Sequence, residues 1–186
     1  MGKIAHPAKA LLDACVLYPT VLREILIGAA RVGLYTPLWS DRILEEWARA
    51  TVKLGPGAEA IARGEIALRA EFPGAAVAPR AGLEARLHLP DRADIHVLAT
   101  AIAGGADVIV TFNAQDFPRH RLAEEGLRRM DPDEFLRALQ ERAPAAVAAA
   151  VETVRARAEE LSGEPQPVRA LLKRARLPRL GKILDR

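Results

Sequence analysis

The 186-residue sequence has only one cysteine, Cys15, and aromatic residues make up only 4% of it. A single cysteine excludes an internal disulfide and a cysteine-rich zinc site, and it is typical of a protein in a reducing cytosol. Hydrophobic residues nevertheless make up 50% of the chain, so it can bury a core. Because aromatic residues are scarce, that core must consist mainly of alanine, valine, leucine and isoleucine.

The sequence also lacks a long apolar run. Its apolar runs are short, such as those at 108–110 and at 143–151, and Pro144 interrupts the second. A helix that crosses a bilayer needs about 18 to 20 apolar residues. The first residues show no signal-peptide pattern. We therefore expect a soluble, cytoplasmic protein that has no membrane partner.

The net charge is small, +3 from 27 basic and 24 acidic residues, and does not by itself indicate a nucleic-acid binder. The charges are, however, unevenly distributed. Residues 166–186 contain seven basic residues and one acid, so the rest of the chain carries a net charge of −3. This basic tail either contacts RNA phosphates or forms the solvated face of helices whose leucines pack inward. The sequence leaves both interpretations open.

Hydrophobic patterning divides the chain into an N-terminal part with strands and helices and a C-terminal part with helices alone. Strands are predicted from apolar runs at 10–17, where the strand ends near Asp13, and at 35–39, 107–112 and 127–130. Helices are predicted over 19–32, 40–52, 58–70, 91–103 and 119–125, and then over 132–142, 145–161 and 168–175. Alternating strands and helices indicate an α/β fold with a central parallel sheet. We expect two domains, 1–130 and 131–186.

Four acids fall at the ends of predicted strands or near the start of predicted core helices. Asp13 closes the first strand, and Asp116 lies in the loop after the strand that ends at Phe112. Asp94 lies in the first turn of a helix, and Glu46 joins the others if its helix begins at the same edge of the sheet. Each acid alone could be an ordinary turn, cap or surface residue. Together they indicate a site, because sites in parallel sheets form beyond the carboxyl ends of the strands.

Such a group of acids indicates metal chemistry. Converging carboxylates repel one another, and a divalent cation offsets that repulsion. A set of oxygen ligands selects Mg²⁺ or Mn²⁺ rather than zinc. These ions orient a water molecule and stabilise charge on a phosphate. The residues therefore indicate hydrolysis of a phosphodiester.

Four segments resemble, in order, the motifs of the PIN-domain nucleases, in the branch of VapC-like toxins from toxin–antitoxin pairs. They are LLDACVL at 11–17, WSDRILEEW at 39–47, DRADIHVLA at 91–99 and VIVTFNAQDFP at 108–118. The resemblance covers about residues 9–130, and the tail resembles a small helical C-terminal domain of some VapC-like members. It implies a three-layer α/β/α PIN-like fold and a Mg²⁺- or Mn²⁺-dependent endoribonuclease that cleaves RNA.

The resemblance also implies roles for individual residues. By position, the catalytic acids are Asp13, Glu46, Asp94 and Asp116. All except Glu46 would hold the metal, directly or through water, whereas Glu46 would help to bind it or position the attacking water. Glu45 competes with Glu46, but the family's acid directly precedes a bulky apolar residue, here Trp47. Cleavage would leave 5′-phosphate and 3′-hydroxyl ends.

Two further residues have supporting roles by the same resemblance. Asn113 would shape the site after the strand, and Asp91 would be an outer acid. Asn113 and Asp116 both fit the fourth motif, so either could be the fourth residue of the metal site. Ala93 stands where many relatives carry another acid, so the choice between one metal and two stays open.

The toxin assignment implies partners besides the RNA substrate. A small cognate antitoxin protein would block the acidic site, and PIN-domain toxins often form homodimers. The alternative is a PIN-like module that binds RNA or a protein without cutting.

Two other classes of protein are disfavoured, because the sequence lacks a feature that each of them needs. A Rossmann-like nucleotide binder needs a glycine-rich turn after the first strand, and that turn is missing. A phosphatase with an aspartyl nucleophile usually has a second acid two residues later, where Cys15 stands. Cys15 is interpreted as a small buried hydrophobe in the first strand region. His96, two residues after Asp94, is interpreted as a core or surface residue on a different helix face.

Overall fold

The computed structural model describes residues 8–52 and 58–185, which form two compact units. The first unit consists of Met1–Tyr18 and Tyr35–Met130, and the second of Pro19–Leu34 and Asp131–Arg186. Residues 19–34, which the sequence pattern placed among the N-terminal elements, therefore belong to the same unit as the C-terminal helices.

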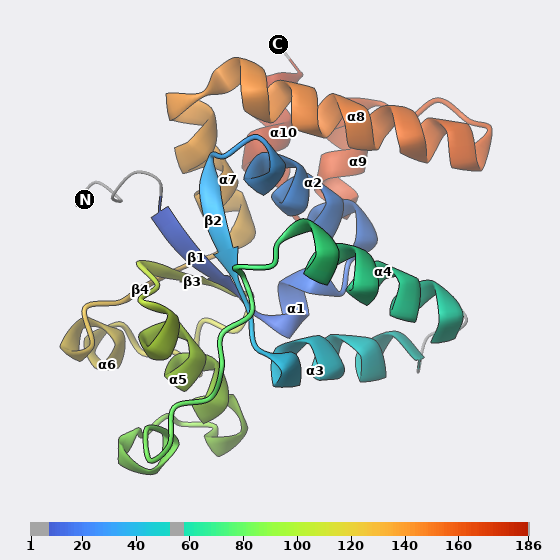
Figure 1. Ribbon diagram of the computed structural model, residues 1–186. Helices are drawn as coiled ribbons and strands as arrows, with labels where there is room; N and C mark the ends of the chain where they lie inside the picture. The colour runs from blue at the N-terminus through green and yellow to red at the C-terminus, as the bar shows by residue number, and fades with distance from the viewer. Residues whose placement is uncertain (1–7, 53–57, 186) are drawn as a thin grey trace. The chain divides into compact units, whose positions relative to one another are not determined.

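A parallel sheet of four strands forms the centre of the first unit, in the order β2-β1-β3-β4 (Figure 1). The strands are β1 (Ala8–Leu12), β2 (Tyr35–Leu38), β3 (Val108–Val110) and β4 (Arg128–Met130). In the two central strands, Ala10 lies opposite Val108 and Leu12 opposite Val110, and all four are buried. Apolar residues in such strands are expected, because both faces of a parallel sheet are usually covered.

Helices of the first unit connect these strands. They are α1 (Ala14–Leu17), α3 (Asp41–Val52), α4 (Ala58–Glu71), η1 (Glu84–Arg86), η2 (Arg92–Asp94), α5 (Ile95–Gly104) and α6 (Arg119–Glu124). Local signals set their ends: the Ser40 hydroxyl accepts a hydrogen bond from the Ile43 backbone N–H at 3.3 Å, and Gly105 ends α5 with a φ of 63°. Helix α5 leads into β3 and packs on β1 and β3. It therefore begins at the edge where the strands end.

The second unit contains helices only. They are α2 (Thr20–Arg31), α7 (Pro132–Arg142), α8 (Pro144–Ser162), α9 (Val168–Arg174) and α10 (Pro178–Leu184). Leu171, Leu172 and Leu180 are buried, while the cationic residues of α9 and α10 are exposed. Helix α10 has no counterpart in the sequence-based assignment. Its start is capped by Asp133, whose carboxylate accepts hydrogen bonds from two backbone N–H groups at 2.9 Å.

The predicted α/β class, with a central parallel sheet followed by a helical C-terminal segment, is confirmed. The first strand ends next to Asp13, as predicted, but it spans Ala8–Leu12, and residues 14–17 of the predicted run form a helix instead. Asp13 is the N-cap of α1, which places Cys15 in a helix, half-buried rather than enclosed in the core. Within residues 8–52 and 58–185, no helix combines the length and the apolar character that a membrane span requires.

Candidate active site

Asp13 follows β1 directly and is 7% exposed. The hydroxyl of Thr111, the residue after β3, donates a 2.7 Å hydrogen bond to Asp13 Oδ2. The thiol of Cys15 donates to the same oxygen at 3.1 Å. Because β1 and β3 are adjacent parallel strands, their carboxyl ends lie side by side, and this proximity brings Asp13 and Thr111 together. The buried carboxylate is therefore held by side chains from the segments that directly follow β1 and β3.

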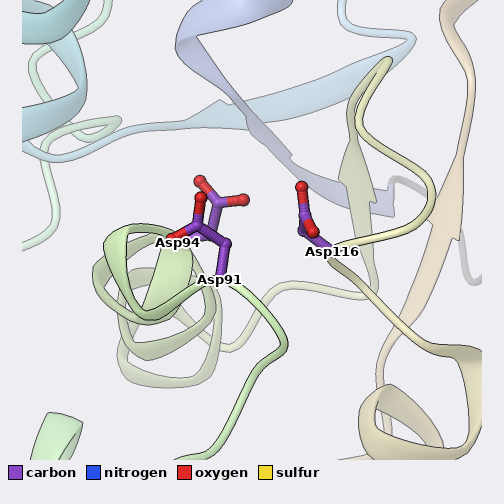
Figure 2. Close-up of side chains that lie close together, drawn as sticks. All are labelled: Asp91, Asp94 and Asp116. Carbon is purple, nitrogen blue, oxygen red and sulfur yellow. The ribbon is translucent and has the colours of Figure 1, made fainter.

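Three further acids converge beside this edge. Asp91, Asp94 and Asp116 each have a carboxylate oxygen within 4.8 Å of the others. Figure 2 shows Asp91 and Asp94 at the start of the α5 helix and Asp116 opposite them, in the loop that follows β3. Asp94 and Asp116 are half-buried, and Asp91 is exposed. We refer to Asp91, Asp94 and Asp116 as the acid cluster.

The electrostatics of Asp94 connect the acid cluster with the other predicted site residues. Burial and, after it, the negative charges of Asp13, Asp91, Asp116 and Glu46 together raise the pKa of Asp94 to about 6. All five carboxylates therefore act on one small region. A carboxyl group that is costly to ionise in the metal-free protein becomes favourable as an anion beside a divalent cation. This all-oxygen donor set fits a hard cation such as Mg²⁺ or Mn²⁺.

Asn113 orients Asp94. Its side-chain amide donates to Asp94 Oδ2 at 2.9 Å. Its backbone N–H donates to the hydroxyl of Thr111, also at 2.9 Å. Thr111 and Asn113 thus connect Asp13 on β1 with Asp94 at the start of α5.

Glu46 enters from α3, which packs against α1. Its Oε1 atom lies 3.0 Å from His96 Nε2 and 3.5 Å from Arg42 Nε. Burial raises the pKa of Glu46, Asp13 adds to this effect, and Arg42 opposes it. Glu45, by contrast, is exposed. Of the two neighbouring acids, Glu46 is the one whose charge acts on Asp94.

His96 is buried, and this burial, together with the charges of Arg42 and Arg49, lowers its pKa to about 4. Its imidazole is therefore neutral near pH 7, and its 3.0 Å contact with Glu46 is not an ion pair. Among the described residues, no group pairs with the other ring nitrogen, Nδ1.

The grouping of acids in the structure differs in one respect from the set that the resemblance implied for the metal. Asp91, expected as an outer acid, lies in the acid cluster with Asp94 and Asp116. Asp13 acts on Asp94 through its charge, but the described group of mutually close ligand oxygens does not include it.

Sequence reasoning assigned no role to Thr111 and none in catalysis to His96. A signal for Thr111 was present, because it is a hydroxyl residue at the end of an otherwise apolar strand, where sites form. No comparable signal exists for His96, because its contact with Glu46 depends on where α3 and α5 lie in the fold.

The comparisons with known proteins agree with this geometry. No curated protein and no solved structure gives a significant match to the chain. The profile of the PIN domain family, however, matches residues 9–115, a range that contains β3, all but the first residue of β1, and Asp13, Glu46, Asp91 and Asp94, and that ends one residue before Asp116. Together with the parallel sheet, this match confirms the PIN-like α/β/α fold and assigns the first unit to a nuclease-type domain. The chain belongs to the PIN domain family.

Proposed function

We propose that this protein is a Mg²⁺- or Mn²⁺-dependent endoribonuclease that hydrolyses phosphodiester bonds of RNA. The observation that carries the proposal is the acid cluster, in which three carboxylates, two of them half-buried, face one another beside the strand ends of a PIN domain. The catalytic acids that we propose are Asp13, Glu46, Asp94 and Asp116, with Asn113 and Asp91 in support.

The surroundings of each acid support a distinct role. When bound, a divalent cation supplies Lewis-acid stabilisation of phosphate charge and lowers the pKa of a coordinated water. Asp94 and Asp116 would hold the cation, with Asp91 or Asp13 completing the set of ligands. Asn113 keeps Asp94 in orientation through its 2.9 Å hydrogen bond. Glu46 would accept a hydrogen bond from the attacking water, because a half-buried carboxylate with a raised pKa is suited to hold a proton.

The test compares cleavage of an RNA substrate by the wild-type protein and by Asp94→Asn at fixed Mg²⁺ concentration. We expect the variant to lose cleavage by orders of magnitude, whereas the control Asp185→Asn, at an exposed position of the second unit, keeps it. Full activity of Asp94→Asn would remove the site assignment. A wild-type protein that neither cleaves RNA nor shows a Mn²⁺-dependent thermal shift would instead favour a non-catalytic PIN-like binding module.

The cellular role that we propose is that of a cytoplasmic VapC-like toxin. This proposal is supported by the order of the four sequence motifs and requires a cognate antitoxin protein that covers the acidic site. Expression of the wild-type protein should then arrest growth, and expression of Asp94→Asn should not. Co-expression of a short neighbouring reading frame should relieve the arrest, and light scattering should show whether the protein forms a homodimer.

A further inference from the structure

His96 is in contact with the carboxylate of Glu46. Its side chain is 3% exposed, and its Nε2 atom is 3.0 Å from Glu46 Oε1. The two atoms are within contact distance, and an ionised carboxylate can only accept a hydrogen bond, so the contact is most favourable when Nε2 carries the ring proton.

A second nitrogen lies near the same oxygen. Arg42 Nε is 3.5 Å from Oε1, so the contacts of both His96 and Arg42 are with this atom. Within the described part of the chain, no other side-chain nitrogen pairs with the carboxylate. Oε2 is therefore the oxygen that would accept a hydrogen bond from water or approach a cation.

The other ring nitrogen of His96 independently indicates that this side chain has a role beyond packing. Nδ1 is buried, and among the described residues no donor reaches it. The hydroxyl of Thr100, one turn along α5, donates to the backbone carbonyl of His96 and not to the ring. A buried polar atom without a partner is unfavourable, and a leucine or phenylalanine would fill this place without that penalty. The contact with Glu46, rather than packing, therefore explains why this position holds a histidine.

We propose that His96 is a positioning residue that fixes the orientation of the Glu46 carboxylate and so presents Oε2 to the reacting groups. This inference rests on the proposed function, in which Glu46 aligns the attacking water. It makes Asp94 and His96, two residues apart at the start of α5, complementary: Asp94 belongs to the acid cluster, and His96 holds the acid that α3 contributes.

The first experiment replaces His96 by phenylalanine, asparagine and glutamine and measures kcat and KM for one RNA substrate. Loss of a residue that orients a site group typically costs about 10- to 100-fold in activity. We expect that loss in kcat for His96→Phe and His96→Asn, with KM little changed. His96→Gln should recover most of kcat, because its amide nitrogen reaches the position of Nε2, whereas asparagine is too short. Glutamine no better than phenylalanine, in variants with equal melting temperatures, would overturn the proposal.

A double-mutant cycle then separates positioning from a general structural role. In the Glu46→Gln background, His96→Phe should cost no further kcat, because the carboxylate that His96 positions is already absent. Independent, multiplicative losses would contradict the proposal.

A spectroscopic measurement needs no activity at all. In ¹⁵N spectra, the imidazole signals of His96 should shift in Glu46→Gln and stay in place in Glu45→Gln. If the spectra are unchanged in both variants, His96 does not contact Glu46 and the proposal is wrong. An inactive wild-type protein with the expected spectra would contradict only the proposed function.

Discussion

Thr111 donates its hydroxyl hydrogen bond to Asp13 across 98 residues of sequence, at a distance of 2.7 Å. Thr111 is 2% exposed and Asp13 is 7% exposed, so neither side chain can rely on solvent. A buried carboxylate is tolerated only when its oxygens accept hydrogen bonds. The Thr111 hydroxyl therefore both stabilises the junction of β1 and β3 and sets the orientation of Asp13.

Replacing Thr111 by valine keeps the shape of the side chain and removes this donor, together with the acceptor of the Asn113 backbone N–H. We expect the free energy of unfolding, measured in urea, to fall by about 1.5 to 3 kcal/mol, the usual range for a hydrogen bond to a charged group. Thr100→Val is the matched control, since its buried hydroxyl donates to a backbone carbonyl within its own helix. That variant should lose less than about 1 kcal/mol, a typical neutral hydrogen bond. Equal losses would show that the carboxylate adds nothing to the Thr111 contact.

Asp94 should make the stability of the metal-free protein depend on pH. Its pKa in the fold is about 6, above the ordinary value of 3.8, so the folded state binds a proton more tightly than the unfolded chain. The stabilising contribution is complete below pH 3.8 and is lost as the pH rises through about 6. At pH 8 the ionised Asp94 therefore opposes folding.

Asp94→Asn should consequently stabilise the metal-free protein at pH 8 and have little effect at pH 4. Because the group is half-exposed and screened by solvent, we expect an increase of about 1 kcal/mol, or about 2 to 4 °C in melting temperature. With Mn²⁺ at pH 8, the wild type should instead have the higher melting temperature, since the ion stabilises it by binding its carboxylates. A lower melting temperature for the metal-free variant at pH 8 would contradict this account.

The neighbours Glu45 and Glu46 provide a matched pair of substitutions. Glu46→Gln should lower kcat for RNA cleavage by at least about 100-fold, the lower range for a residue in acid–base catalysis. Glu45→Gln removes the same charge one position earlier, at an exposed site, and should leave kcat unchanged. A larger loss in Glu45→Gln would reverse the assignment of the acid on α3.

The basic surface of α9 and α10 can be tested without disturbing the core. Truncation is unsuitable, because Leu171, Leu172 and Leu180 are buried. A triple substitution to glutamine is preferable, at the exposed positions Lys173, Arg179 and Lys182. If these residues contact RNA phosphates, the slope of log affinity against log salt should become shallower by about 2, at 0.7 per contact for single strands.

Binding should be measured in the Asp94→Asn background, which prevents cleavage. The control removes three positive charges elsewhere in the same unit, at Arg137, Arg142 and Arg157. An identical salt slope in the triple variant and the control would identify the tail as a solvated face with no role in RNA binding.

The secondary structure of the first unit follows largely from local chemistry. Ser40 predicts the start of α3 and Gly105 the end of α5, because helix caps depend on residues within one turn. The apolar run at 108–110 predicts a buried strand for the same reason. Helix α10 was missed because the groups that stabilise its start come from Asp133, far along the chain.

The sequence by itself determined that acids stand at strand ends and at the start of α5, and hence that this edge of the sheet is a candidate metal site. Only the tertiary structure decided which oxygens face one another: Asp91 with Asp94 and Asp116, Thr111 with Asp13, and His96 with Glu46. The reason is physical. Caps and apolar periodicity act over a few residues, whereas convergence of side chains depends on strand register and on where whole helices pack.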